Sequence, residues 1–155
     1  MRMDKRSLWL VILILLLGTA VRFYHIQTQS IWFDEGWSAY AAAQPTLIDA
    51  WNADLTNPPL YYLTLNAAAR FIGQTELALR WVSLAFGLLT AALAYRLGRH
   101  LFGDQAGIMA SLLLMLSPLM WWASQEARMY TQLAALVLLC ALAWHGLMRQ
   151  PRQYW

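Results

Sequence analysis

The residues that could do chemistry in this chain are a few charged side chains set among aromatic ones. Asp34 and Glu35 are adjacent in the stretch SIWFDEGWSAYAA, which also contains Trp32, Phe33 and Trp37. A carboxylate beside an apolar region can act as a general base, bind a metal ion or pair with an arginine. The pair could equally be an ordinary first turn of a helix, where acidic residues are favoured by the helix dipole.

A second charged group lies in the stretch SQEARMY, residues 124–130. Ser124 is suited to cap the N-terminus of a following helix, and Glu126 would then lie in its first turn. Arg128 near a helix N-terminus opposes the helix dipole, so an anionic ligand or Glu126 should favour it there. Contact with lipid headgroups is the alternative explanation for Arg128.

Between these two groups lies the stretch NPPLYYL, residues 57–63. Two consecutive prolines hold the backbone extended and then allow a helix to begin. Tyr61 and Tyr62 suit a membrane interface. The residues alone therefore favour a helix start with an aromatic anchor over a binding site.

Other familiar site patterns do not occur in the sequence. His25, His100 and His145 lie far apart without the His-x-x-His or Glu-x-x-His spacing of a metal site. The single cysteine, Cys140, lies in an apolar run and cannot form a disulfide within the chain. There is no glycine-rich nucleotide loop and no Gly-x-Ser-x-Gly motif, which argues against nucleotide binding and serine hydrolase chemistry.

The composition indicates which elements must position these residues. Hydrophobic residues make up 60% of the 155 residues, charged residues 12%, and the mean hydropathy is +0.42. These values are typical of an integral membrane protein. Apolar runs predict an all-α fold with about four membrane-spanning helices, at about 8–26, 81–97, 106–122 and 129–148. Arg22, in the first run, is expected to extend toward the interface.

The first run also has the features of a signal peptide, because basic residues precede it and the small-residue stretch GTA follows its apolar core. We favour an uncleaved anchor, since further spans follow and aromatic residues continue past the cleavage site. Both interpretations put the N-terminus inside and Asp34 outside.

The run Leu60–Ile72 decides the expected topology. It is short and contains Asn66 and Arg70, so we expect a helix lying against the outer interface rather than a span. Four spans then divide the basic residues seven to four, and a fifth span would divide them six to five. The inside residues would be Arg2, Lys5, Arg6, Arg96, Arg99, Arg149 and Arg152, and the outside residues Arg22, Arg70, Arg80 and Arg128. The positive-inside rule thus favours cytoplasmic termini and a long outer loop, residues 27–80, with juxtamembrane helices.

The order of these stretches resembles the N-terminal portion of the GT-C membrane glycosyltransferases. The likeness rests on an anchor followed by SIWFDE, NPPLYYL, ALRWVSLAFGLLTAALAYRLGRHLFG and SPLMWWASQEARMY. It is greatest to the branch of families 39 and 83, which holds protein O-mannosyltransferases, the lipid A aminoarabinose transferase and galacturonosyltransferase-like proteins. The resemblance implies a partial GT-C fold, with residues 1–155 as the N-terminal part of the membrane domain.

The resemblance also implies a function, namely inverting transfer of a hexosyl or pentosyl group from a polyprenyl-phosphate donor. The acceptor would be a lipid, glycan or protein at the outer face of the cell membrane. An acceptor hydroxyl needs a base, and an arginine can offset charge on the departing phosphate. The implied catalytic residues are Asp34 and Glu35, and the implied substrate-binding residues are Asn57, Arg80, Glu126, Arg128 and Tyr130. Relatives often carry His in place of Asn57, so hydrogen bonding rather than proton transfer is expected there.

GT-C enzymes have many more spans than four, so this chain is expected to be part of such an enzyme and inactive by itself. A non-catalytic membrane module, or a truncated remnant of the enzyme, is the alternative. A small transporter is disfavoured, because no predicted span carries a charge near its centre. No pattern requires a metal or other cofactor, although a divalent metal stays open, and no basic stripe indicates nucleic acid.

Overall fold

The computed structural model describes residues 5–24 and 26–149. Within these ranges every regular element is a helix, as the sequence predicts. The eight described helices are α1 (Lys5–Phe23), α2 (Phe33–Ala42), α3 (Leu47–Trp51), α4 (Pro59–Ile72), α5 (Glu76–Phe102), α6 (Asp104–Leu116), α7 (Pro118–Gln125) and α8 (Tyr130–Arg149).

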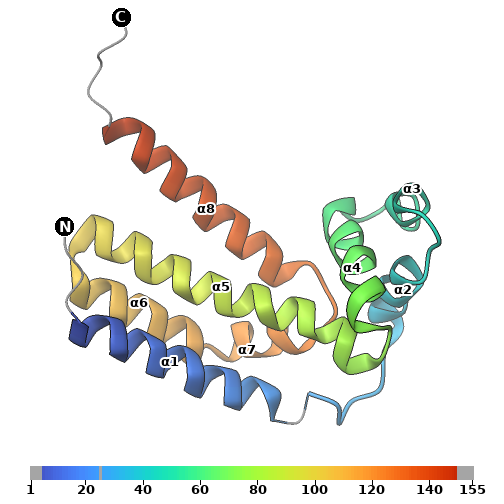
Figure 1. Cartoon of the computed structure of the whole chain (residues 1–155), viewed down its shortest axis with the longest axis horizontal. Coiled ribbons are helices and arrows are strands. Elements are labelled where there is room, and N and C mark those ends of the chain that lie inside the picture. The colour runs from blue at the N-terminus through green and yellow to red at the C-terminus, as the bar shows by residue number, and fades with distance from the viewer. Residues whose placement is uncertain (1–4, 25, 150–155) are drawn as a thin grey trace, which may run out of the picture.

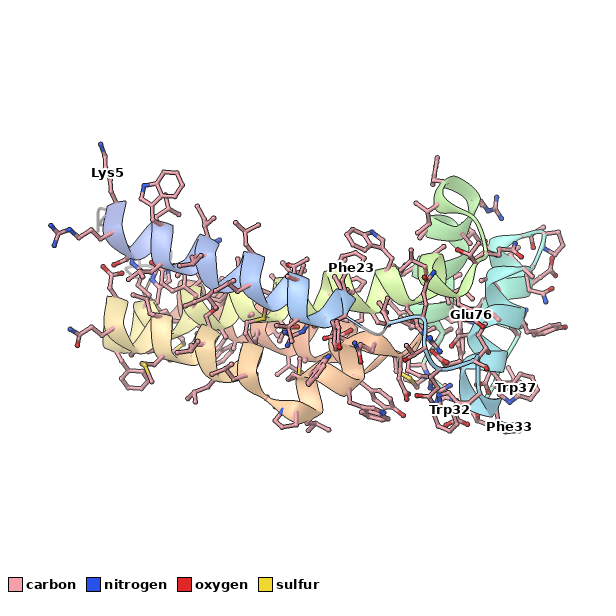
Figure 2. All side chains as sticks on the ribbon, turned by 90° about the horizontal axis from the view of Figure 1, so that it is seen from below. Lys5, Phe23, Trp32, Phe33, Trp37 and Glu76 are labelled. Carbon is pink, nitrogen blue, oxygen red and sulfur yellow. The ribbon has the colours of Figure 1, made fainter. Side chains whose placement is uncertain are left out.

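The longest helix, α5, is the centre of the molecule. Helices α1 and α6 lie along it, and α8 packs against it and diverges toward its own C-terminal end (Figure 1). Helices α2, α3 and α4 gather at the end where α5 begins (Figure 1). In Figure 2, Trp32, Phe33 and Trp37 lie at that end, opposite Lys5. The two groups of charged residues therefore meet at the same end of the bundle.

Helices α1, α5 and α8 (its residues Tyr130–Met148) are long and apolar enough to cross a membrane. Helices α6 and α7 meet the same test together, but they are bent by 60° and make a fourth crossing only if the pair forms one span. The chain is thus an all-α integral membrane protein. The segment predicted as a span over 106–122 is not one straight helix, because Pro118 lacks the N–H that a helix needs and interrupts it.

The sequence suggested that Arg22 extends toward the membrane interface, but in the structure it does not. Its side chain is fully buried (0% exposed) and donates hydrogen bonds to the carbonyls of Leu114 and Met115, at 3.3 and 3.1 Å. Pro118 has no N–H to donate to the Leu114 carbonyl four residues earlier, so Arg22 supplies a donor that the helix lacks. Arg22 also donates to Ser124 Oγ at 3.2 Å. It therefore joins α1 to the bend between α6 and α7.

Helix α5 begins at Glu76, before the predicted span, because the Thr75 hydroxyl accepts a hydrogen bond from Ala78 N at 3.2 Å and caps the helix. Arg80 consequently lies in the second turn of a helix rather than in a loop. At the other end Gly103, with φ of 96°, ends α5 and leads directly into α6. The two helices approach closely, since a Cβ at Gly107 would lie 2.5 Å from the Tyr95 carbonyl oxygen.

Helix α4 is not among the described helices that are long and apolar enough to cross a membrane, and its place against the outer interface stays a prediction. Tyr61 and Tyr62 are each 1% exposed and belong to the core between α2, α4 and α5. Their interpretation as interfacial anchors was therefore wrong. Asn66 satisfies the end of α2, because its amide donates to the carbonyls of Ala41 and Ala42.

Candidate active site

Glu35 and Arg80 form a buried ion pair. Glu35 Oε1 accepts from Arg80 Nε at 2.9 Å, and Oε2 accepts from Arg80 Nη2 at 2.7 Å. Their side chains are 1% and 3% exposed. Since α2 begins at Phe33, Glu35 and Asp34 lie in its first turn, where neighbouring side chains point about 100° apart. Glu35 therefore points toward α5, and Asp34 points in a different direction.

The remaining bonding capacity of this pair is also used. Glu35 Oε1 accepts a further hydrogen bond from Ala127 N at 2.8 Å. Arg80 Nη1 donates to the carbonyls of Ile26 and Gln29, at 2.7 and 2.8 Å. The pair thus ties three segments of the chain together, namely the connection after α1, the start of α2 and the loop before α8. Both carboxylate oxygens of Glu35 are thus hydrogen-bonded within the protein.

Asp34 differs from Glu35 in both burial and bonding. Its side chain is half-buried, and its carboxylate has no hydrogen bond within the described part of the chain. Its backbone carbonyl accepts from Arg128 Nη1 at 3.0 Å. Asp34 therefore presents, beside Arg128, a carboxylate without a hydrogen-bond partner among the described residues, and its charge acts on Arg128.

Arg128 is 6% exposed, and within residues 5–24 and 26–149 its Nε has no hydrogen-bond partner. Burial lowers the pKa of Arg128, but Tyr130, Tyr62 and Asp34 more than offset this and raise it above its ordinary value. The guanidinium therefore stays charged and retains a donor. A buried, charged group with an unused N–H is suited to bind an anion such as a phosphate oxygen.

The backbone around Arg128 is held by hydroxyl groups that sequence reasoning missed. Ser83 Oγ donates to the Arg128 carbonyl at 3.0 Å and lies 2.9 Å from the Tyr61 hydroxyl. Thr131 Oγ1 donates to the Ser83 carbonyl at 2.8 Å. Small hydroxyl residues inside an apolar run, such as Ser83 in α5, were the available signal.

Glu126 lines a small cavity of about 110 Å³ together with Glu35, Arg80 and Gln125. It is 6% exposed, and its Oε2 has no hydrogen-bond partner among the described residues. Burial, and then the nearby charge of Glu35, raise the pKa of Glu126 above its ordinary value. The site therefore holds one acid whose pKa is raised close to another that is paired with Arg80.

Two expectations about this loop are corrected by the structure. Ser124 does not cap the last helix, because it lies inside α7 and its hydroxyl donates to the Met120 carbonyl at 2.6 Å. Glu126 ends α7 rather than lying in the first turn of α8, which begins at Tyr130. Pro118 causes both differences, since it starts a separate short helix that uses these residues. Tyr130 stacks on Trp122, with ring centroids 5.6 Å apart.

Asn57 lies in a compact loop before α4, and its amide donates to Asp54 Oδ2 at 2.7 Å. The Tyr62 hydroxyl donates to the same oxygen at 2.6 Å, and Thr56 donates to Asp54 Oδ1 from its backbone and its hydroxyl. Burial opposes ionisation of Asp54, but these hydrogen bonds hold its pKa well below its ordinary value. Sequence reasoning missed Asp54, although an Asp two residues before a Thr is a known turn signal.

The described histidine, cysteine and acidic side chains form no group of three or more that could hold a metal ion. His25 lies outside the described residues. Of the predicted site residues, the structure brings Asp34, Glu35, Arg80, Glu126 and Arg128 together at one end of α5. Tyr130 adjoins this group, and Asn57 is connected to it through Asp54 and Tyr62.

Comparison with known proteins agrees with the likeness found in the sequence. Residues 56–155 match the family described as dolichyl-phosphate-mannose-protein mannosyltransferase, and this range includes α4, α5 and the loop of Glu126 and Arg128. Asp34 and Glu35 precede the matched range. The curated proteins and the solved structures give no significant match. Because the match covers about two thirds of the chain, this protein belongs to the dolichyl-phosphate-mannose-protein mannosyltransferase family of membrane glycosyltransferases.

Proposed function

We propose that this chain forms the N-terminal catalytic part of a glycosyltransferase that takes its sugar from a polyprenyl-phosphate donor. The acceptor is a hydroxyl group on a lipid, glycan or protein at the outer face of the cell membrane. The observation that carries the proposal is the contact of Arg128 with the backbone of Asp34, which puts a charged, buried guanidinium next to an unengaged carboxylate.

In the proposed reaction Asp34 accepts the proton of the acceptor hydroxyl. The hydroxyl oxygen attacks the anomeric carbon of the sugar, and the bond from that carbon to the phosphate oxygen breaks from the opposite side. The bonding electrons leave with the lipid phosphate, so the anomeric configuration inverts. A general base of this kind contributes roughly 10²–10⁴-fold to the rate.

Arg128 is proposed to bind the lipid phosphate as it departs. Its Nε has no partner among the described residues, and its planar guanidinium can offer two N–H groups to phosphate oxygens. Charge on the phosphate increases in the transition state, so this contact strengthens as the reaction proceeds. Tyr130 and Asn57 are proposed to line the same substrate region.

Glu35 and Arg80 are proposed to act as positioning residues rather than as catalytic ones. Both ends of their ion pair are buried and fully bonded, and the pair connects the turn of Asp34 to the loop of Arg128. A displacement of either residue would separate the base from the phosphate site, and small errors in such geometry are costly to catalysis.

We further propose that both termini are cytoplasmic, that residues 27–80 lie outside, and that further spans complete the donor cavity. The basic residues at the end of the bundle where α1 begins support this orientation, because Lys5, Arg96 and Arg99 all lie there. The isolated chain should then bind the donor weakly and show no turnover.

Donor binding to the purified chain tests the phosphate site directly. The chain in detergent would be titrated with a polyprenyl-phosphate mannose and, separately, with the same polyprenol without phosphate. Arg128→Gln should weaken phosphate-dependent binding about tenfold or more, since a charge-assisted hydrogen bond contributes roughly 1.5–3 kcal/mol. Arg70→Gln is the matched control, because Arg70 is exposed at the same end of the molecule. Equal losses in the two variants would contradict the proposed role of Arg128.

A further inference from the structure

A second place for a ligand lies at the other end of the bundle, between α5 and α8. The two helices diverge there (Figure 1) and leave a groove of about 420 Å³. Arg80 and Arg96 both lie on α5, sixteen residues apart, so the groove is about 24 Å from the candidate active site. It belongs to no part of the reaction described above.

The groove is basic at its rim. Arg96 and His100 contribute from α5, and His145 contributes from α8. The two imidazole rings lie 6.1 Å apart. No acidic side chain lines the groove in the described part of the chain, and the nearest acid on α6, Asp104, already pairs with Arg99 at 2.6 Å.

Two of the basic groups have unused bonding capacity. Arg96 is exposed and makes no ion pair or side-chain hydrogen bond with the described residues. His145 Nε2 is shielded from solvent and, within residues 5–24 and 26–149, has no hydrogen-bond partner. A shielded ring nitrogen without a partner is costly, so a ligand that supplies an acceptor or a donor there would be favoured.

The walls of the groove are apolar. Leu93 of α5 and Leu139 and Leu142 of α8 face it, each about one or two helical turns from a basic residue. Helix α8 is largely uncovered by the rest of the described chain, since only 17% of its apolar segment is buried. Trp144 is 67% exposed beside His145, at the level where tryptophan favours the membrane–water interface. The groove therefore has apolar walls, and its basic rim adjoins a tryptophan of the kind that favours the membrane–water interface.

We propose that this groove binds an anionic glycerophospholipid, with the phosphate at Arg96, His100 and His145 and an acyl chain along the leucines. Arg96 supplies a charge and a planar pair of donors to the phosphate. Basic pockets between membrane helices are suited to anionic headgroups for the same reason. A free phosphate ion would gain the charge contact alone, whereas a lipid also buries its chain against apolar surface.

Lipid binding to the purified chain tests the proposal. Native mass spectrometry and thermal unfolding would be followed with phosphatidylglycerol, with phosphatidylcholine of the same acyl chains, and with inorganic phosphate. We expect phosphatidylglycerol to bind at least about tenfold more tightly than phosphatidylcholine. Inorganic phosphate should displace it only weakly. Arg96→Gln should remove most of this preference, and Arg70→Gln, at the other end, should keep it.

A second variant tests the groove without changing its charge. A Cβ at Gly146 would meet nothing within 4 Å, so Gly146→Trp can fill the groove without disturbing the helix. This variant should also lose bound phosphatidylglycerol while it unfolds at an unchanged temperature. Equal binding of the two lipids, or full retention of phosphatidylglycerol by both variants, would overturn the proposal. Displacement of the lipid by low concentrations of inorganic phosphate would instead show a plain anion site.

Discussion

Arg80 and Glu35 are 45 residues apart in the chain, and two hydrogen bonds of 2.9 and 2.7 Å join their side chains in a nearly solvent-free position. This ion pair distinguishes two carboxylates that look equivalent in the sequence. Glu35 is fully bonded, and its neighbour Asp34 is not. The two acids should therefore respond differently to the same kind of substitution.

Glu35→Gln should destabilise the protein. Removing one partner of a buried ion pair leaves the other charge unpaired and costs about 3–5 kcal/mol. Thermal unfolding in detergent would measure the loss. Asp49→Asn, which changes an exposed acid between α2 and α4, is the control and should change stability by less than about 1 kcal/mol. Similar losses for the two variants would show that the ion pair does not support the fold.

Asp34→Asn should lower turnover without lowering stability. The amide keeps the shape of the carboxylate and removes its basicity, so kcat in the complete enzyme should fall roughly 10²–10⁴-fold. Unfolding temperature and protein level should stay near those of the unmodified enzyme, because the Asp34 side chain makes no hydrogen bond with the described residues. If Asp34→Asn turns over normally and Glu35→Gln is well folded but inactive, the assignment of the base is reversed.

Much of the fold could be predicted from apolar runs alone, as α5 and α8 show. The break at Pro118 was missed because its neighbours are as apolar as those of a continuous span, and hydropathy does not report a missing backbone donor. Arg22 was misread for the same reason. Its partners are carbonyls exposed by that break, so its burial follows from a contact more than 90 residues away.

The residues of the candidate site could be singled out from the sequence and its resemblance, but their partners in the fold could not. Which of Asp34 and Glu35 faces Arg80 depends on where α2 begins, and that start at Phe33 carries no capping side chain that a sequence reveals. Tyr61 and Tyr62 looked interfacial because aromatic residues favour both interfaces and cores. Only the packing of α4 on α5 distinguishes a core position from an interfacial one. In this packing the Tyr61 hydroxyl contacts the Ser83 hydroxyl.

The outer loop should face the external solution. In a Cys140→Ser background, an impermeant thiol reagent added outside intact cells should label Gln74→Cys and leave Arg152→Cys unlabelled. The basis is the excess of basic residues expected inside. Gln74 is exposed, so failure to label it would reflect the side of the membrane rather than burial. Labelling of position 152 with none at position 74 would reverse the topology.

Asp54→Asn should destabilise the protein at neutral pH by about 2–3 kcal/mol, because it weakens hydrogen bonds made to a charged acceptor. The pKa of Asp54 is lowered in the folded state, so its stabilising contribution is complete above the ordinary carboxyl pKa and is lost as pH falls through the lower folded value. Unfolding temperatures of the two proteins should therefore converge in acid. A difference in unfolding temperature that is constant with pH would contradict an ionised Asp54 in the folded protein. Asp49→Asn is the control.

Glu126→Gln should have the opposite dependence on pH. Burial and Glu35 raise the pKa of Glu126, so the folded protein holds this proton more tightly than the unfolded chain does. Stability should then fall as pH rises from the ordinary carboxyl pKa through the raised one, and remain lower above it. Glutamine imitates the neutral acid at every pH. The variant should match the unmodified protein in acid and exceed it at higher pH.

At high pH the variant Glu126→Gln should be more stable than the unmodified protein by roughly 1–3 kcal/mol. This is the cost of a buried polar group without a partner, and Glu126 Oε2 has none among the described residues. Unfolding temperature would be measured from about pH 4, near the ordinary carboxyl pKa, upward to neutral pH and above. Glu76→Gln serves as the control, because Glu76 is partly exposed and accepts a hydrogen bond from Ile31 N. The opposite result would be a Glu126→Gln variant that is less stable than the unmodified protein at high pH. It would mean that Glu126 is ionised and paired in the folded state, and that the cavity beside Arg80 stabilises its charge.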